Sequence, residues 1–238
     1  AFNAAGAAGL GRMILINKCD MDNVQFSDLV GEIQEVFGPG CVPLNVPIGT
    51  GGDFSGVVST LDVPDDVPDG VELDPGEVNQ ALMDAIVEAD EELMERFLEG
   101  ETLSQDELSS GIKTAIAAGT LIPIVCSSSR TAVGVDEFLD ALVGCCLAPG
   151  DVARTVSVAG EDVDIEVGSD RLVAQIFKTR IDPFVSKMSF IRVFSGTLKK
   201  DSSVQVPRIG KSIKIGQLLS VNGAEQDNVD QAVAGRIV

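Results

Sequence analysis

The sequence contains no histidine, tryptophan or tyrosine, so its ten phenylalanines are the only aromatic residues among 238. Histidine is the side chain that metal sites and general-base mechanisms use most often. Its absence excludes most sites of both kinds, and we expect no metal site. Because aromatic residues make up only 4% of the chain, aliphatic side chains must form the core. No apolar run reaches the about 20 residues that a membrane-spanning helix needs.

The cysteines are five in number, an odd count, and form no CxxC pair; they are Cys19, Cys41, Cys126, Cys145 and Cys146. This usage favours buried, reduced thiols in a cytoplasmic protein over a disulfide framework. The sequence begins without methionine and without a basic, apolar leader, and its first residues are typical of a helix. We therefore expect no signal peptide and a chain that starts inside a longer protein.

The net charge of −20 is unevenly distributed. Residues 171–238 carry 11 Lys or Arg and 5 Asp or Glu, whereas residues 1–170 carry 6 and 32. Opposite charge in two halves indicates different partners, and clustered cations suit contacts with nucleic-acid phosphates. An ordinary solvated surface is the alternative for either half. The basic residues of the second half include Lys178, Arg180, Lys187, Arg192, Lys199, Lys200, Lys211 and Lys214.

The first 150 residues show the pattern of an α/β domain. Apolar runs at 13–16 and 120–126 are typical of buried parallel strands, and helices are predicted over 26–37 and 135–147. Between them, Asp74 as N-cap, with Pro75 after it, predicts one long helix that ends at Gly100. Ser104 and Glu107 have the spacing of a capping box and predict a further helix that ends at Gly119.

The remainder of the chain has a different period. Residues 151–170 are predicted to form a linker with a hairpin, after a break at Pro149 and Gly150. Strands are then predicted at 172–177, 188–194, 204–206 and 213–221. Short strands with turns about every 10 residues indicate an all-β barrel or sandwich.

The strand at 13–16 ends in Asn17, Lys18, Cys19 and Asp20, which fit an NKxD guanine-recognition motif. A carboxylate such as that of Asp20 can accept from both N1–H and N2–H₂ of guanine, a donor pair that adenine lacks. The Asn17 amide would brace the loop, and the Lys18 stem would cover one face of the base. A plain polar turn is the alternative, because four-residue patterns also occur by chance.

The strand at 120–126 ends in a serine-rich loop that contains Ser128, Ser129 and Arg130. In GTPases a Ser-Ala-x loop lies at this point, and one of its backbone N–H groups reads guanine O6. Ligands of open α/β sheets bind at the carboxyl ends of the strands, so two such loops in this order are more specific than either alone. The predicted guanine-binding residues are Asn17, Lys18, Asp20, Ser128 and Ser129.

Several further segments, together with the NKxD run, resemble bacterial elongation factor G. They lie at 46–49, 54–58, 88–100, 182–187 and 190–196. The resemblance runs over nearly the whole chain but covers only part of a complete factor, from the middle of the G domain into domain II. The departures are Ser129 in place of alanine, Ser59 in place of aspartate, and an end at Val238 before the last strands of the barrel. They are the basis for suspecting a divergent paralogue.

The resemblance implies a partial P-loop-type GTPase sheet of α/β class with an inserted α+β subdomain, followed by a translation-factor β-barrel. Residues 1–150 would be the C-terminal part of the G domain, with the G′ insertion at about 39–119. Residues 151–170 would be the linker, and 171–238 an incomplete domain II. The 108 positions between Asp20 and Ser128 agree with an insertion, since a minimal GTPase fold needs a single helix and strand there.

The phosphate-handling motifs of a GTPase are missing from this sequence. Gly210, Lys211 and Ser212 copy the end of a P-loop, but Gln205 stands where its first glycine is needed. Two DxxG matches, at 28–31 and 53–56, follow the NKxD run and so come in the wrong order. A P-loop supplies donors to the phosphates and a hydroxyl to Mg²⁺. We therefore expect no catalytic residue, no hydrolysis, and weak or no GTP binding by this segment alone.

The resemblance also implies a role for the whole protein, as a cytoplasmic, ribosome-dependent GTPase that promotes translocation and uses GTP or GDP with Mg²⁺. The basic barrel would contact small-subunit ribosomal RNA, and the acidic insertion, with Glu88, Glu92 and Glu95, would contact the ribosomal stalk protein. Three alternatives stay open: a non-hydrolysing, GTPase-derived module that docks on ribosomes, a ribosome-recycling paralogue, and an unrelated acidic α/β protein with a chance NKxD run.

Overall fold

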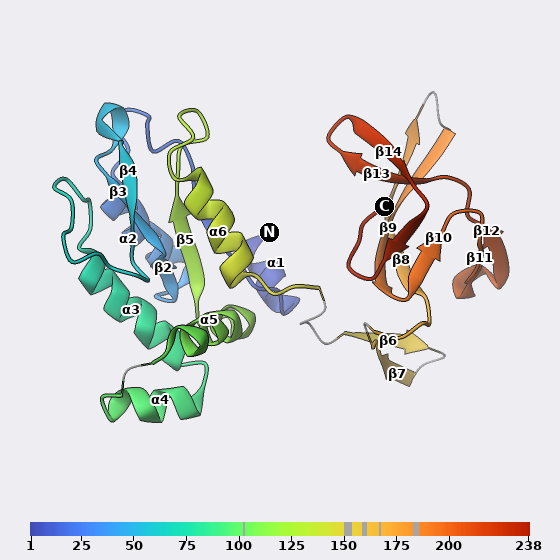
Figure 1. The fold of residues 1–238 in the computed structure, drawn as a ribbon, viewed down its shortest axis with the longest axis horizontal. Helices are drawn as coiled ribbons and strands as arrows, with labels where there is room; N and C mark the ends of the chain where they lie inside the picture. Colours follow the sequence, from blue (N-terminus) through green and yellow to red (C-terminus); the bar gives the residue numbers. More distant parts are fainter. Residues whose placement is uncertain (102, 150–153, 159–160, 167, 183–185) are drawn as a thin grey trace. The chain divides into compact units, whose positions relative to one another are not determined.

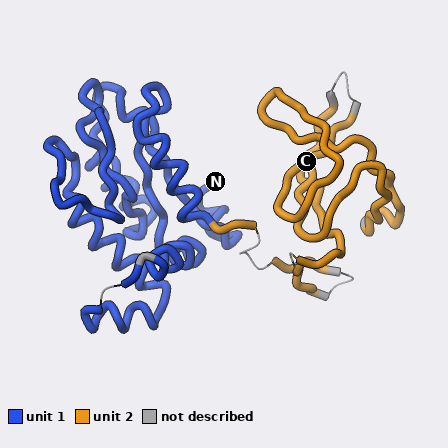
Figure 2. The backbone as a smooth tube through the Cα atoms, in the orientation of Figure 1, with its two compact units in different colours: residues 1–146 blue, residues 147–238 orange. Residues whose placement is uncertain are grey.

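The computed structural model divides the chain into two compact units, residues 1–146 and residues 147–238 (Figure 2). The structure describes residues 1–238 except 102, 150–153, 159–160, 167 and 183–185. Part of the predicted linker at 151–170, and the Pro-Phe-Val stretch at 183–185 that contributes to the resemblance, lie outside the described residues. Among these described residues, the first unit contains two hydrophobic clusters and the second contains one.

The first unit is built around a parallel sheet with the strand order β1-β5-β2. Figure 1 labels β5 and β2 of this sheet. These strands are β1 (Ile14–Ile16), β5 (Ile122–Cys126) and β2 (Cys41–Pro43). All five residues of the central strand β5 are buried, as expected for a parallel strand that is covered on both faces.

Helices cover the two faces of this sheet. On one face, Ile124 packs in a cluster with Phe26 and Val30 of α2 (Phe26–Phe37), and Phe2 of α1 (Phe2–Ala7) packs against that cluster. On the other face, Val125 packs in a cluster with residues of α3 (Pro75–Val87), α5 (Gln105–Ala118) and α6 (Val135–Cys145). Neighbouring residues of β5 thus serve opposite faces, as the pleat of a strand requires.

The described residues between β2 and β5 form a hairpin and three α-helices. The hairpin pairs β3 (Asn45–Ile48) with β4 (Gly56–Ser59), with the short helix η1 (Gly51–Asp53) between them. The helices are α3, α4 (Glu91–Leu98) and α5. Although β2 falls within the range 39–119 predicted for the insertion, its fully buried residues pair with β5 in the main sheet.

The single long helix predicted from Pro75 to Gly100 is wrong, because the chain forms α3 and α4 as separate helices. The break has a local cause. The Asp90 carboxylate accepts from the backbone N–H groups of Glu92 at 3.0 Å and Leu93 at 3.2 Å, which caps the start of α4. This cap ends the first helix even though apolar residues at helical spacing continue from Val78 in α3 to Phe97 in α4.

The second unit is made of antiparallel strand pairs. They are β6 (Thr155–Val158) with β7 (Glu161–Asp164), β8 (Val173–Asp182) with β9 (Ser186–Ser195), β10 (Thr197–Lys199) with β15 (Gln231–Val233), β11 (Ser203–Val206) with β12 (Lys211–Lys214), and β13 (Leu218–Asn222) with β14 (Glu225–Val229). A short helix, η2 (Pro207–Ile209), joins β11 to β12. The strand predicted at 213–221 is divided between β12 and β13, with Gly216 in the gap.

The core of the second unit is small and aliphatic. Val193, Leu198, Leu218, Ala232 and Val238 are buried together. The end of the chain lies against β9, since Ile191 and Val238 exchange backbone hydrogen bonds of 2.7 and 3.0 Å. Throughout the described part of the chain, every helix is too short or too polar to cross a membrane.

Candidate functional site

Two loops leave the sheet at the same edge because β1 and β5 are parallel neighbours. Ile16, the last residue of β1, is in register with Cys126, the last residue of β5. The backbone N–H of Cys19 donates to the carbonyl of Ser127 at 3.2 Å, and the N–H of Ser127 donates to the carbonyl of Ile16 at 2.9 Å. The NKxD run and the serine-rich loop, about a hundred residues apart in the chain, therefore lie side by side.

Asn17 ties the two loops together. Its Oδ1 accepts from the backbone N–H of Lys18 at 2.8 Å and of Ser129 at 2.9 Å. Its Nδ2 donates to Ser129 Oγ at 3.1 Å. Lys18 has a φ of 69°, a left-handed conformation that is uncommon outside glycine, and its side chain is exposed. The amide thus braces the loop, as the sequence analysis expects of this residue.

Asp20 is the buried acceptor of the site, with 7% of its surface exposed. Ser128 Oγ donates to Oδ1 at 2.5 Å, and Arg130 Nε donates to Oδ2 at 2.5 Å. A second guanidinium nitrogen of Arg130, Nη2, forms an ion pair with the same Oδ2. The hydrogen bond from Ser128, followed by that from Arg130, lowers the pKa of Asp20 below its ordinary value. The carboxylate is therefore ionised at neutral pH and can act only as an acceptor.

Asn45 is a supporting residue that the sequence analysis did not identify. Its Oδ1 accepts from the backbone N–H of Cys126 at 2.8 Å, and its Nδ2 donates to the carbonyl of Cys126 at 3.3 Å. The buried side chain thus takes the place of a strand backbone and holds the last residue of β5, from which the serine-rich loop begins. No sequence signal points to this pair, because the two residues are 81 positions apart.

The site also includes Arg130, whose pairing with Asp20 was not predicted from the sequence. The structure brings together all five predicted residues, Asn17, Lys18, Asp20, Ser128 and Ser129, on adjoining loops. A buried carboxylate beside a bracing amide is a set of groups that can recognise the polar edge of a planar base. The backbone N–H groups of Ser128 and Ser129 donate within the protein, to the carbonyl of Val133 and to Asn17 Oδ1.

The two cysteines next to these loops are buried. Cys19 and Cys126 are free thiols with no exposed surface. A hydrogen bond with Cys19, together with burial, raises the pKa of the Cys126 thiol. A thiol in this state is a poor nucleophile, so Cys126 contributes packing. Cys146 is the exposed one of the five cysteines.

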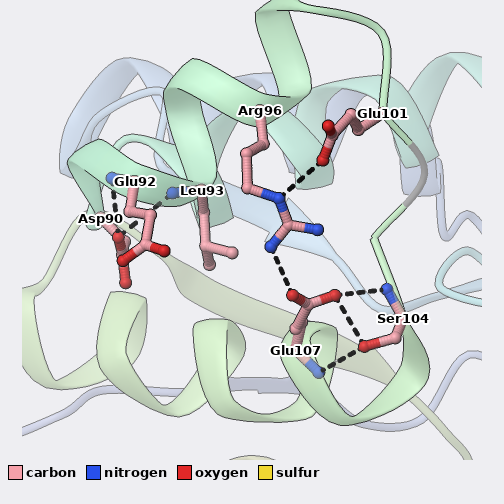
Figure 3. A network of polar contacts seen from close by, with 7 residues as sticks. All are labelled: Asp90, Glu92, Leu93, Arg96, Glu101, Ser104 and Glu107. Atoms are coloured by element: carbon pink, nitrogen blue, oxygen red, sulfur yellow. Dashed lines mark hydrogen bonds and ion pairs between the residues drawn. The ribbon is translucent and has the colours of Figure 1, made fainter.

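The α4–α5 region contains a second polar cluster (Figure 3). Arg96 of α4 donates to Glu101 at 2.8 Å and forms a short ion pair with Glu107 of α5. Glu107 also accepts from the backbone N–H of Ser104 at 2.8 Å, so the capping box predicted for these two residues is present. Arg96, and next Ser104, lower the pKa of Glu107 to about 2. These contacts fasten α4 to the start of α5.

The charged residues proposed to meet partners are largely at the surface. Glu88, at the end of α3, and Glu92 and Glu95 of α4 are exposed. The basic residues that the sequence analysis names in the second half are exposed, except for Arg192, which is half-buried. One of them, Lys178, lies 5.5 Å from the centre of the Phe190 ring, a cation–π geometry.

The chain combines an α/β unit, in which the parallel strands β1 and β5 end in two adjoining polar loops, with a following unit of antiparallel strand pairs. Residues 171–238 match the family model of elongation factor G domain 2. A crystal structure of a Thermus thermophilus protein is similar over 99% of this chain, with a TM-score of 0.76 and 24% sequence identity. The chain covers 35% of that protein's length. At this level of identity the comparison establishes the fold.

Proposed function

We propose that this chain is a segment of a translational GTPase of the elongation factor G type. The observation that carries the proposal is the joining of the NKxD run to the serine-rich loop through Asn17, Asp20, Ser128 and Ser129. The domain 2 match of residues 171–238 supports it from a second, independent part of the chain. The whole protein would promote translocation in protein synthesis.

Residues 1–150 supply guanine recognition in this proposal. The Asp20 carboxylate accepts from N1–H and N2–H₂ of the base. The backbone N–H of Ser129, which donates to Asn17 Oδ1 in this structure, turns to O6, while that of Ser128 keeps its bond to the carbonyl of Val133. The Lys18 stem covers one face of the ring. Adenine is rejected because it presents no donor pair to the buried carboxylate, which would lose the donors of Arg130 without gaining new ones.

The nucleotide phosphates need groups that this sequence does not contain. GTP or GDP with Mg²⁺ would be held in the whole protein by a P-loop and a DxxG motif placed in the correct order. With base recognition alone, this segment binds nucleotide weakly and does not hydrolyse it. The residues of this segment therefore have a binding role and no catalytic one.

Two surfaces dock on the ribosome in this proposal. The exposed cations of the second unit contact phosphates of small-subunit ribosomal RNA. The acidic first half repels the same RNA, so the RNA binds to the second unit. The exposed carboxylates of α3 and α4 contact the stalk protein. Both contacts would take place in the cytoplasm.

Changing Asp20 to asparagine tests the guanine site. An asparagine side chain accepts one hydrogen bond and donates another, which matches N1–H and the O2 carbonyl of xanthine instead of the two donors of guanine. We expect the wild-type chain to bind guanosine in preference to adenosine, and Asp20→Asn to prefer xanthosine to guanosine by at least about tenfold. Titrations followed by the amide NMR signals of Ser128 and Ser129 measure both preferences.

Asp22→Asn is the matched control, since it removes the same charge from an exposed position two residues away. Its preference should stay with guanosine. Equal binding of guanosine and adenosine by the wild-type chain, or an Asp20→Asn variant that keeps the guanosine preference, would refute the assignment of Asp20.

A further inference from the structure

Arg130 occupies positions on the Asp20 carboxylate that a guanine base would use. A carboxylate offers about four lone-pair positions. Arg130 takes two on Oδ2, through Nε at 2.5 Å and through Nη2, and Ser128 Oγ takes one on Oδ1 at 2.5 Å. The single remaining position is on Oδ1. Guanine presents two adjacent donors and needs a position on each oxygen, so it cannot bind while both Arg130 contacts persist.

The two members of this ion pair differ in their exposure to water. The Arg130 side chain is 72% exposed, whereas the Asp20 side chain is 5% exposed. An exposed guanidinium returns to water at little cost, but a buried carboxylate that loses its partner stays desolvated and unpaired. Asp20 therefore stays in place with a partner, and Arg130 is the group that can leave.

The rest of the site does not depend on Arg130. The bonds between Asn17 and Ser129 and between Ser128 and Asp20 join the two loops without it. The loops consequently keep their relative position when the guanidinium swings into solvent. The contacts of Arg130 with Asp20 Oδ2 are therefore the ones that a base must displace from the carboxylate.

We propose that Arg130 is a displaceable counter-ion of Asp20, which pairs with the carboxylate when no base is bound and must release at least one of its two contacts before guanine can bind. The inference rests on the proposed guanine site and adds a residue that controls the strength of base binding. An ion pair with an exposed partner is weakened by salt, so base binding through this exchange strengthens as salt rises.

Guanosine is the appropriate probe, because it is neutral and its own binding has no net charge for salt to screen. We expect the guanosine affinity of the wild-type chain to rise between about 0.05 and 0.5 M NaCl, over which the screening length shortens severalfold. Arg130→Gln should bind guanosine about two- to fivefold more tightly at low salt, in line with the strength of exposed ion pairs, and lose the salt dependence.

Lys199→Gln provides the control for charge, since it removes one exposed cation from the other compact unit. It should leave both the affinity and its salt dependence as in the wild-type chain. Arg130→Lys keeps the charge but not the forked donor geometry, and should fall between the wild-type chain and Arg130→Gln. Far-ultraviolet circular dichroism checks that each variant is folded.

The possible results separate this inference from the function on which it rests. If guanosine binds selectively but Arg130→Gln binds it no more tightly, and salt has no effect, then Arg130 does not compete with the base and the counter-ion role is overturned. Weaker binding by Arg130→Gln would show that the residue assists the base, with the same consequence. If neither chain prefers guanosine to adenosine, the proposed guanine site fails, and the inference fails with it.

Discussion

Replacing Asn45 by alanine should destabilise the first unit strongly, because the side chain forms both hydrogen bonds of the Cys126 backbone on that side of β5. Asn45 is 4% exposed, so water cannot take over either bond easily. The variant leaves one buried N–H and one buried carbonyl of Cys126 unsatisfied. Each such group costs about 1–3 kcal/mol, and for the pair we expect a loss of about 2–6 kcal/mol in the free energy of unfolding.

Urea unfolding followed by circular dichroism at about 222 nm is the suitable assay. The sequence has no tryptophan or tyrosine to give a fluorescence signal, and all described α-helices lie in the first unit. Native-state hydrogen exchange of the Cys126 amide supplies a local readout and should become faster in the variant.

Asn79→Ala is the graded control for this experiment. Asn79 is partly buried, and its Nδ2 donates to the carbonyl of Thr60 at 2.7 Å and, at the longer distance of 3.4 Å, to that of Leu61. We expect a loss of about 1 kcal/mol for this variant. A cost below about 0.5 kcal/mol for Asn45→Ala, with unchanged exchange at Cys126, would refute the view that Asn45 substitutes for a strand backbone.

Two further predictions concern the acidic helices. Glu107 has a pKa of about 2 in the folded chain, below its ordinary value of 4.5. Its contribution to stability is therefore complete at a pH above about 4.5 and is lost as the pH falls towards 2. Glu107→Gln should therefore lower the melting temperature at pH 7, and the gap between the melting temperatures of the variant and the wild-type chain should shrink towards pH 2. A gap that stays constant with pH would contradict the ion pair with Arg96. Replacing the exposed carboxylates by glutamine should weaken binding to the ribosomal stalk in a pull-down or titration, most clearly at low salt, and unchanged binding would exclude this surface; the positions are Glu88, Glu92 and Glu95.

Local patterns were sufficient to predict much of the secondary structure. Helix α2 lies at the predicted 26–37, and the capping box of Ser104 and Glu107 forms at the start of α5. Gly119 ends α5 in the left-handed conformation that its lack of a side chain allows. Periodicity, caps and strand-end motifs involve residues within a few positions of each other, so the sequence displays them directly.

Competition between local signals was harder to judge. The apolar stripe from Val78 to Phe97 favours a single helix, yet Asp90 caps a new helix within it. Similarly, the predicted strand at 213–221 is divided around Gly216. In both places apolar residues continue past the point where one element ends, so hydrophobic periodicity alone does not reveal where it ends.

The chemistry of the candidate site depends on contacts between residues distant in the chain. The order of motifs placed Asp20 and Ser128 at strand ends, but it could not show that Arg130 pairs with Asp20 across 110 positions or that Asn45 holds Cys126. Such contacts arise only when β1, β5 and the segment after β2 pack together, because hydrogen-bond geometry and burial are properties of the folded arrangement. The sequence therefore specified which polar groups follow the two strands, and the fold decided which partners hold them.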